Sequence, residues 1–168
     1  MKLFTNFFIG WIQSFFKVKH LSIKAKISKG ANLEKGVYSL GDVVISSKAT
    51  IGKGTYINSG IMDRAKIGRY CSISYNVLIG LREHDYNFET MSPVKSQELY
   101  GDSELANKPC EFAIIEDEVW IGANVTVLQG VTVGYGAVIG AGSVVTKSIP
   151  AYEIWAGVPA KRISIRDR

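Results

Sequence analysis

The chain has 168 residues, 46% hydrophobic and 21% charged, which is long enough for one compact core and too short for two independent ones. Its 17 glycines and 4 prolines accompany plentiful apolar residues, so the composition excludes a disordered chain and assigns the glycines to turns. The formal net charge of +5 permits a polyanionic partner, such as a nucleotide or an acidic membrane, without selecting one. Cys71 and Cys110 have no CxxC spacing, which favours a reducing cytoplasm over a disulfide framework.

The N-terminal segment, residues 1–20, is predicted to hold an amphipathic helix. Apolar side chains recur there at helical spacing, at Phe4, Phe7, Phe8, Trp11, Ile12, Phe15 and Phe16. Polar residues interrupt the run and no small-residue cleavage site follows, which argues against a signal peptide, and the run is too short to span a bilayer. Two roles stay open, a cap on the open end of the fold and peripheral membrane contact through residues 1–19.

A six-residue period runs through the chain beyond this segment. It is uninterrupted at Ile115, Ile121, Val127, Val133, Ile139 and Val145. Upstream the same spacing occurs at Leu21, Ile27, Leu33, Ile45, Ile51 and Ile57 and again at Ile61, Ile67, Ile73 and Ile79. Ser39 is out of pattern, and the phase slips by four residues between Ile57 and Ile61. Neither a helix nor plain strand alternation gives a period of six, whereas short strands joined by tight turns give one side of a prism per repeat.

A second register follows four residues after each aliphatic position and holds small or β-branched residues. Its members include Ala31, Ala49, Thr55, Ala65, Cys71, Val125, Val131, Ala137 and Ser143. Both registers are predicted to point into the prism. Val44, Val138 and Val144 fall outside them and are expected to be exposed, which favours association of several chains.

These tandem [LIV]-G-x-x-[STAV]-x repeats resemble the bacterial hexapeptide-repeat acyltransferases. The resemblance implies an all-β fold, a left-handed parallel β-helix of hexapeptide repeats over residues 21–161 with a tail at 162–168. The left hand comes from the resemblance alone, because parallel crossovers usually turn right. Residues 119–161, which close in GVPAK, are similar to the sugar, maltose, galactoside and xenobiotic O-acetyltransferases.

One long loop, residues 81–112, interrupts the repeats, and a loop of this length in a solenoid is often functional. It opens with a polar run that contains His84, and NVLIGLREH resembles the segment in which these acetyltransferases carry their catalytic histidine. The resemblance therefore implies an acetyl-CoA-dependent O-acetyltransferase. Neutral imidazole can take the proton of an acceptor hydroxyl near neutral pH, so His84 is the candidate general base.

The remaining site residues form a substrate set and a cofactor set. The substrate set is Asn58, Arg82, Glu83, Asp85, Tyr86 and Trp120. The set that the resemblance implies for acetyl-CoA is Ala123, Ala141, Thr146 and Lys161, to which Lys147 and Arg162 can add charge-assisted bonds to phosphates. No GxSxG turn is present and Cys71 falls on the inward register, which favours direct transfer in a ternary complex. Only two histidines exist, so no metal is expected.

Three functions stay open from the sequence. The first is O-acetylation of a sugar or a surface-polysaccharide precursor. The second is N-acetylation of an amino sugar nucleotide, or acetylation of a xenobiotic, and the third is a non-catalytic hexapeptide scaffold. The expected partners are a sugar acceptor and two further copies in a homotrimer, with no nucleic acid. The expected location is cytoplasmic, with peripheral contact at the inner face of the membrane.

Overall fold

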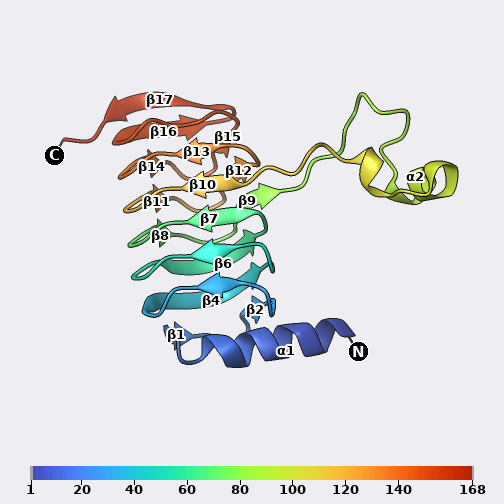
Figure 1. The fold of residues 1–168 in the computed structure, drawn as a ribbon. Coiled ribbons are helices and arrows are strands. Elements are labelled where there is room, and N and C mark those ends of the chain that lie inside the picture. Colours follow the sequence, from blue (N-terminus) through green and yellow to red (C-terminus); the bar gives the residue numbers. More distant parts are fainter. Residues whose placement is uncertain (1, 168) are drawn as a thin grey trace.

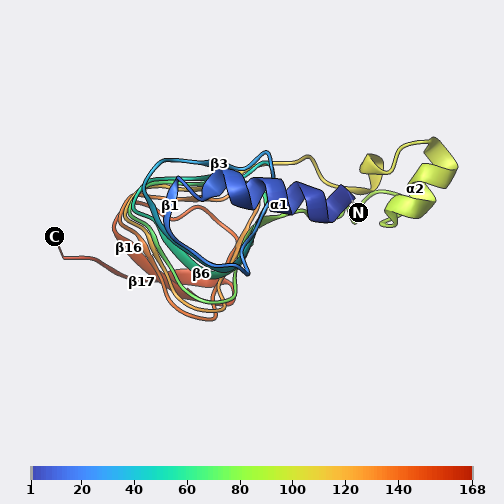
Figure 2. The same ribbon diagram turned by 90° about the horizontal axis from the view of Figure 1, so that it is seen from below.

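The computed structural model describes residues 2–167, and these form a three-sided solenoid with a helix across one end (Figure 1). Each turn of the chain gives one short strand to each of three faces, and the strands of successive turns pair in parallel. The fold is the left-handed parallel β-helix that the sequence predicted. Seen from below, the three faces enclose a single core (Figure 2).

The three faces are defined by their strands. Face 1 holds β1 (Val18–Leu21), β8 (Ser72–Ile73), β11 (Trp120–Ile121), β14 (Val138–Ile139) and β16 (Glu153–Gly157). Face 2 holds β2 (Lys26–Ile27), β9 (Val77–Leu81), β12 (Thr126–Leu128) and β15 (Val144–Val145). Face 3 holds β3 (Asn32–Leu33), β5 (Thr50–Ile51), β7 (Ala65–Ile67), β10 (Ala113–Ile115) and β13 (Thr132–Val133). Two longer strands, β4 (Val37–Ile45) and β6 (Tyr56–Met62), bend around the corner between faces 1 and 2, and β17 (Ala160–Ile165) pairs antiparallel with β16.

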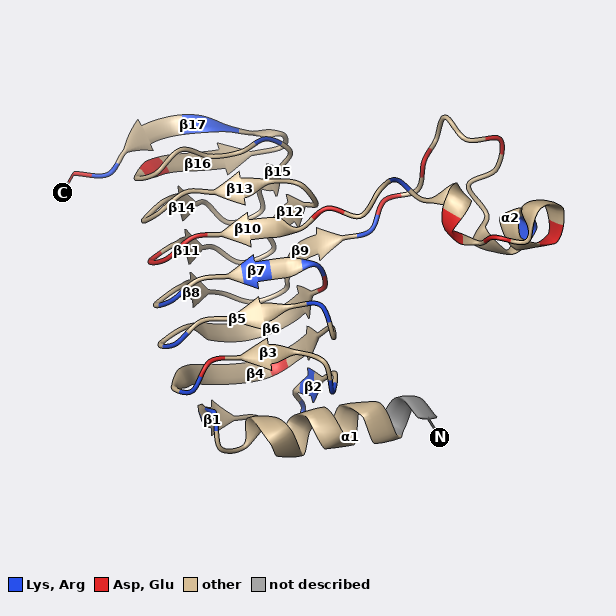
Figure 3. Cartoon of the chain, in the orientation of Figure 1, with Lys and Arg blue, Asp and Glu red and all other residues tan. Residues whose placement is uncertain are grey.

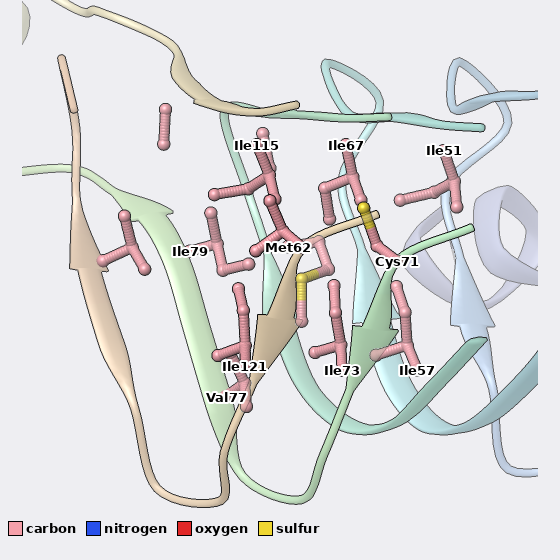
Figure 4. Close-up of a cluster of buried hydrophobic side chains, with 14 of the residues drawn as sticks. Ile51, Ile57, Met62, Ile67, Cys71, Ile73, Val77, Ile79, Ile115 and Ile121 are labelled. Carbon is pink, nitrogen blue, oxygen red and sulfur yellow. The ribbon is translucent and has the colours of Figure 1, made fainter. Parts of the chain in front are cut away.

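Aliphatic side chains stack along the axis and form the core. Ile121 pairs with Ile73 in the preceding turn and with Ile139 in the next, and all three are fully buried. Figure 4 shows Ile73 and Ile121 in this core. Parallel strands lie about 4.8 Å apart, so each aliphatic side chain contacts its neighbours above and below. Burial of each such side chain contributes roughly 1.5–3 kcal/mol, which explains why the six-residue period persists.

The structure corrects the predicted inward register at one position and fills a gap at another. Met62 is fully buried while Ile61, which the period placed inward, is 38% exposed, and Leu40 is buried next to Ser39, which was out of pattern. The reason is that β4 and β6 continue around a corner, so Leu40 pairs with Ile57 and Met62 with Ile79. Gly60 allows this bend, since it has φ +135° and a Cβ there would lie 1.9 Å from the carbonyl oxygen of Val77.

The outward valines are less exposed than expected. Val44, Val138 and Val144 are half-buried. Val138 shows the cause, because it lies between Trp120 in the preceding turn and Ile154 in the next. Side chains on the outer surface of a parallel sheet thus cover one another even without a partner chain.

Helix α1 (Lys2–Ser14) lies across the open end of the first turn (Figures 1 and 2). Its approach is close, because a Cβ at Gly10 would lie 2.0 Å from the carbonyl oxygen of Ile27. Trp11 Nε1 donates to the carbonyl oxygen of Ser22 at 2.9 Å, and the Trp11 ring packs against the core. Between residues 2 and 167, no helix has the length and apolar content required to cross a bilayer.

The predicted loop leaves the solenoid between β9 and β10 and contains two helical segments that the sequence did not predict. These are α2 (Pro93–Tyr100) and the 3₁₀ helix η1 (Glu104–Ala106). Ser92 caps α2 by accepting from the Lys95 N–H at 3.3 Å, and Gly101 ends it with φ +71°. Only Ser96 of α2 is buried, so the helix lacks the apolar stripe that periodicity detects.

The corrected register predicts that substitution of Met62 destabilises the protein more than substitution of its neighbour Ile61. Met62→Ala should lower the free energy of unfolding by about 2–5 kcal/mol, because it leaves a cavity in the core. The control Ile61→Thr should cost less than about 1 kcal/mol, because its side chain points outward. Urea unfolding measures both. Equal losses, or a larger loss at Ile61, would contradict this register.

Candidate functional site

The two ends of the insertion run antiparallel where they meet the solenoid, and His84 lies in this neck. The Asp85 N–H donates to the carbonyl oxygen of Ala106 and the Lys108 N–H to that of Glu83, both at 3.0 Å. His84 stands opposite Asn107 between these two bonds. Residues in such a non-hydrogen-bonded pair have Cα atoms about 4.5 Å apart and adjacent side chains on one face. Asn107 is therefore the nearest cross-strand neighbour of His84, and the sequence did not identify it.

Ion pairs stiffen the neck around His84. Lys108 Nζ lies 2.9 Å from a carboxylate oxygen of Glu83 and 5.0 Å from the ring centroid of Tyr86. The hydrogen bond to Glu83 raises the pKa of the Lys108 ammonium group. Arg82 pairs with Glu104 of η1, and this hydrogen bond lowers the pKa of the Glu104 carboxyl group. Exposed pairs of this kind each contribute at most about 1 kcal/mol, so their effect is to restrict the neck rather than to stabilise the fold.

The imidazole of His84 is exposed, and the adjacent carboxylates are engaged elsewhere. An Asp85 oxygen accepts from the Asn87 N–H at 3.0 Å in a local turn, and Glu83 pairs with Lys108. Strand alternation puts both acidic side chains on the face of the neck opposite to that of His84. Within residues 2–167, neither carboxylate hydrogen-bonds to the imidazole, so neither orients it.

A second group of predicted residues lies along the corner between faces 1 and 2, which we call the first edge. Asn58, Ala123 and Ala141 occupy this corner in different turns, and the Gly142 N–H donates to the carbonyl oxygen of Ala123 at 2.8 Å. Lys161 pairs with Ala156 in the hairpin of β16 and β17 and continues this edge at the C-terminal end. Trp120 is exposed on the adjoining face 1.

A third group follows β15 at the corner between faces 2 and 3, which we call the second edge. Thr146 and Lys147 lie here, both exposed. The insertion leaves from the same edge after β9, and β12 separates β9 from β15 on face 2. Two strand spacings correspond to about 10 Å along the axis. Arg162 stands apart on β17, where it pairs with Glu153 at 3.3 Å.

The structure thus divides the predicted site residues between two edges of one chain. The second edge carries Thr146, Lys147 and the neck with His84. The first edge carries Ala123, Ala141 and the substrate candidate Asn58, with Trp120 and Lys161 close by. The strands of face 2 lie between the two edges, so a single chain does not bring His84 to the first edge.

The buried thiol is unsuited to covalent catalysis. Burial raises the pKa of the Cys71 thiol to about 11, and its Sγ donates to the carbonyl oxygen of Glu116 at 3.1 Å. A thiol that stays protonated at neutral pH is a poor nucleophile. In the part of the chain that the structure describes, no three His, Cys, Asp or Glu side chains gather in a way that could hold a metal ion.

Comparison with known proteins supplies the family. A family model described as "Hexapeptide repeat of succinyl-transferase" matches residues 113–147. A protein assigned as the lipopolysaccharide biosynthesis O-acetyl transferase WbbJ of Escherichia coli strain K12 is 32% identical over 136 residues, which cover 81% of this chain and 67% of the relative. Chloramphenicol acetyltransferase of Klebsiella aerogenes is 30% identical over 170 residues, which cover 96% and 78%.

A solved structure agrees with these relatives. The hexapeptide-repeat acetyltransferase of Vibrio cholerae O1 biovar eltor, in complex with acetyl coenzyme A, superposes with a TM-score of 0.61 and 26% sequence identity over 82% of this chain and 72% of that one. Two relatives at 30% identity or above, each matched over two thirds of its length, extend the likeness beyond the fold. The chain therefore belongs to the hexapeptide-repeat acetyltransferases, enzymes that take their acetyl group from acetyl-CoA.

Proposed function

We propose that this enzyme transfers an acetyl group from acetyl-CoA to a hydroxyl of a sugar or of a surface-polysaccharide precursor. The observation that carries the proposal is the neck, which holds the exposed imidazole of His84 at the edge of the solenoid. Backbone hydrogen bonds join the two chain segments of the neck, and the ion pair between Lys108 and Glu83 links their side chains. A relative assigned to lipopolysaccharide O-acetylation supports a saccharide acceptor. The reaction is proposed for the cytoplasm, where acetyl-CoA is made.

In this proposal His84 is the general base. Its unprotonated nitrogen takes the proton of the acceptor hydroxyl while the hydroxyl oxygen attacks the thioester carbonyl. A C–O bond forms, the tetrahedral intermediate collapses, the C–S bond breaks, and the imidazolium returns its proton to the departing thiolate. Backbone N–H groups lining the cleft stabilise the oxyanion. The protonated Cys71 supports direct transfer in a ternary complex, without an acyl-enzyme.

Asn107 is a positioning residue in the same proposal. Its side chain is adjacent to that of His84 across the neck, and no carboxylate holds the ring. An amide oxygen can accept a hydrogen bond from one ring nitrogen and leave the other free to act as the base. Arg82, Glu83 and Tyr86 act through the ion pairs and the cation–π contact that fix the neck, and Asp85 closes its turn.

Acetyl-CoA is proposed to lie along the first edge of a second chain in a homotrimer. Ala123 and Ala141 have small side chains there, so the pantetheine chain would approach the backbone of this edge closely. The Lys161 cation would meet phosphate, and Arg162 would do so only by leaving Glu153. Asn58 and Trp120 would flank the acceptor where the neck of the neighbouring chain approaches this edge. Thr146 and Lys147, on the second edge, would contact cofactor bound to the adjacent interface.

A second candidate acceptor is a xenobiotic alcohol, because a chloramphenicol acetyltransferase matches nearly the whole chain. The loop sequence HDYNFETMSPV differs from the pattern that we associate with the xenobiotic branch. N-acetylation of an amino sugar nucleotide is the other enzymatic alternative. Peripheral membrane contact through residues 1–19, which the sequence left open, is compatible with each acceptor.

The general-base assignment predicts opposite kinetic effects for two variants. His84→Ala should lower kcat by about 10²–10⁴-fold and leave the Kd for acetyl-CoA nearly unchanged. The control Lys161→Ala should raise the Kd for acetyl-CoA by about three- to tenfold with a smaller effect on kcat. Steady-state kinetics with calorimetric binding separates these outcomes.

The positioning role of Asn107 predicts a smaller loss of activity for Asn107→Ala than for His84→Ala. Asn107→Ala should lower kcat by about tenfold without changing the KM for acetyl-CoA, and Asn107→Gln should recover part of the loss. His84→Ala with more than about a tenth of wild-type turnover would eliminate the general-base role. If His84→Ala lowers the melting temperature substantially, the residue is structural and Asp85 and Glu83 become the next candidates.

The acceptor class is tested by release of free CoA from acetyl-CoA. Simple sugars and surface-polysaccharide fragments should stimulate release above the rate of hydrolysis, while amino sugar nucleotides and chloramphenicol should not. His84→Ala is the background control, because every true acceptor must lose its stimulation in that variant. A strong response to chloramphenicol alone would replace the saccharide proposal with the xenobiotic one.

The shared site predicts complementation between two inactive chains. His84→Ala removes the base, and Ala141→Trp fills the first edge with a bulky side chain, so each variant alone should be inactive. In trimers mixed at equal amounts, about a quarter of the sites would join an intact neck to an intact first edge, restoring about that share of activity. Light scattering verifies the trimer. Mixed trimers without any activity would show that each chain builds its own site.

A further inference from the structure

Helix α1 has an amphipathic arrangement opposite to that of an ordinary surface helix. Its fully buried residues are small, since Gly10 contacts Ile27 and Ser14 donates from Oγ to the Gly10 carbonyl oxygen at 2.7 Å, and the partly buried Trp11 packs beside them against the core. Two large apolar residues of α1, Phe8 and Ile12, are exposed, and so is Phe15 in the turn that follows the helix. A surface helix normally buries its apolar stripe against the core. The outward stripe of α1 therefore makes no contribution to the core of this chain.

The exposed apolar surface continues beyond the helix. Phe16 is 83% exposed and Ile23, in the first corner of the solenoid, is 88% exposed. A groove joins α1 to this corner and is lined by Phe7, Phe8, Trp11, Ile23, Lys24, Ala25, Lys26 and Asp42. A cluster of large apolar residues on the surface of a chain typically marks a site of contact with a partner or a membrane. We call α1 together with residues 15–29 the basal face.

The charge around the basal face is mostly positive. Residues 1–33 contain six lysines and no aspartate or glutamate, whereas residues 34–168 contain 14 basic and 15 acidic residues. The net positive charge of the chain therefore comes from this segment. Figure 3 shows the basic residues of β1 and β2 next to the uncharged described part of α1. Among the described residues that line the groove, Asp42 is the only carboxylate.

We propose that the basal face docks on the surface of a bilayer that contains anionic lipid. Ile12, Phe15, Phe16 and Ile23 enter the boundary between headgroups and acyl chains. The lysines meet anionic headgroups, namely Lys17, Lys19, Lys24, Lys26 and Lys29. Apolar area combined with lysines at its rim is the composition that holds a helix in the plane of a membrane.

The helix docks without leaving the solenoid. The Gly10 contact with Ile27, the Trp11 bond to Ser22, and a bond from the Lys29 N–H to Asn6 Oδ1 at 3.3 Å fix it to the first turn. Because its inward side makes these contacts and its outward side carries the apolar stripe, the chain binds the membrane as one rigid body. The proposal is independent of the acceptor and of the acetyl transfer reaction.

The test is cosedimentation of the full-length protein with two kinds of vesicle, pure phosphatidylcholine and phosphatidylcholine with one part in four of phosphatidylglycerol. The protein should bind the anionic vesicles at least about tenfold more tightly, since each lysine near an anionic surface contributes roughly a fivefold factor. High salt should reduce this preference, because the charges are exposed to screening. Equal binding to both vesicles, or binding to neither, would overturn the proposal.

Two sets of variants separate the apolar and the charged contributions. Ile12→Gln/Phe16→Gln/Ile23→Gln and, separately, Lys24→Glu/Lys26→Glu should each weaken binding to the anionic vesicles by at least about tenfold. Matched controls are Ile163→Gln/Ile165→Gln, exposed on β17 at the opposite end, and Lys95→Glu on α2. Both controls should bind as the wild type does, and melting temperatures should verify folding.

A protein partner would give a different result. If light scattering without vesicles shows an assembly that the Ile12/Phe16/Ile23 variant loses, and no vesicle binding occurs, the basal face is an interface between copies and the proposal is wrong. If that variant fails to fold, the lysine variant and the salt dependence of the wild type decide. Loss of vesicle binding in the Ile163→Gln/Ile165→Gln control would also contradict the proposal, because membrane contact would then not be confined to the basal face.

Discussion

Stacking of strands about 4.8 Å apart is the constraint on which the rest of this structure depends. Each turn must place an aliphatic side chain above the one before, as Ile121 lies between Ile73 and Ile139. Backbone hydrogen bonds between turns and the enclosed core then stabilise the solenoid without any covering layer. The corners between faces do not have to stack aliphatic side chains. The first edge can therefore hold small residues, and the second edge can hold the whole insertion. The candidate site is built from these corners.

The sequence predicted the core where its registers are set by local spacing, and failed where contacts between turns set them. Bends in β4 and β6 bury Met62 in place of Ile61 and bury Leu40 next to the out-of-pattern Ser39. These bends depend on glycines whose backbone contacts the next turn of the solenoid. The spacing of apolar residues along the sequence does not reveal such contacts between turns. His84 became the candidate general base through its place in the insertion and the resemblance of NVLIGLREH, and this role stays a prediction. Asn107 could not be found by periodicity, although an insertion that leaves and returns at one edge must bring its two ends together as antiparallel neighbours.

Helix α1 shows the same limit in another form. The apolar stripe was visible in the sequence, but the pattern alone does not determine which side of the helix contacts the solenoid. Gly10 settles the matter, because a residue without Cβ lets the helix backbone reach the carbonyl of Ile27. Close contact through Gly10 lets Trp11 pack against the core and leaves Phe8 and Ile12 exposed. The sequence left a cap and membrane contact as alternatives, and the structure shows a cap that also carries an exposed apolar surface.

The placement of α1 also bears on how several chains could share a site. The candidate residues lie on two edges of each chain with face 2 between them, so a site that combines His84 with Ala123 and Ala141 needs a neighbour that approaches from the side. A cap that lay along a face would block that approach. Helix α1 instead crosses the end of the solenoid, and the hairpin of β16 and β17 extends face 1 at the other end (Figure 1). Lateral association and contact through the basal face therefore use different surfaces, and neither excludes the other.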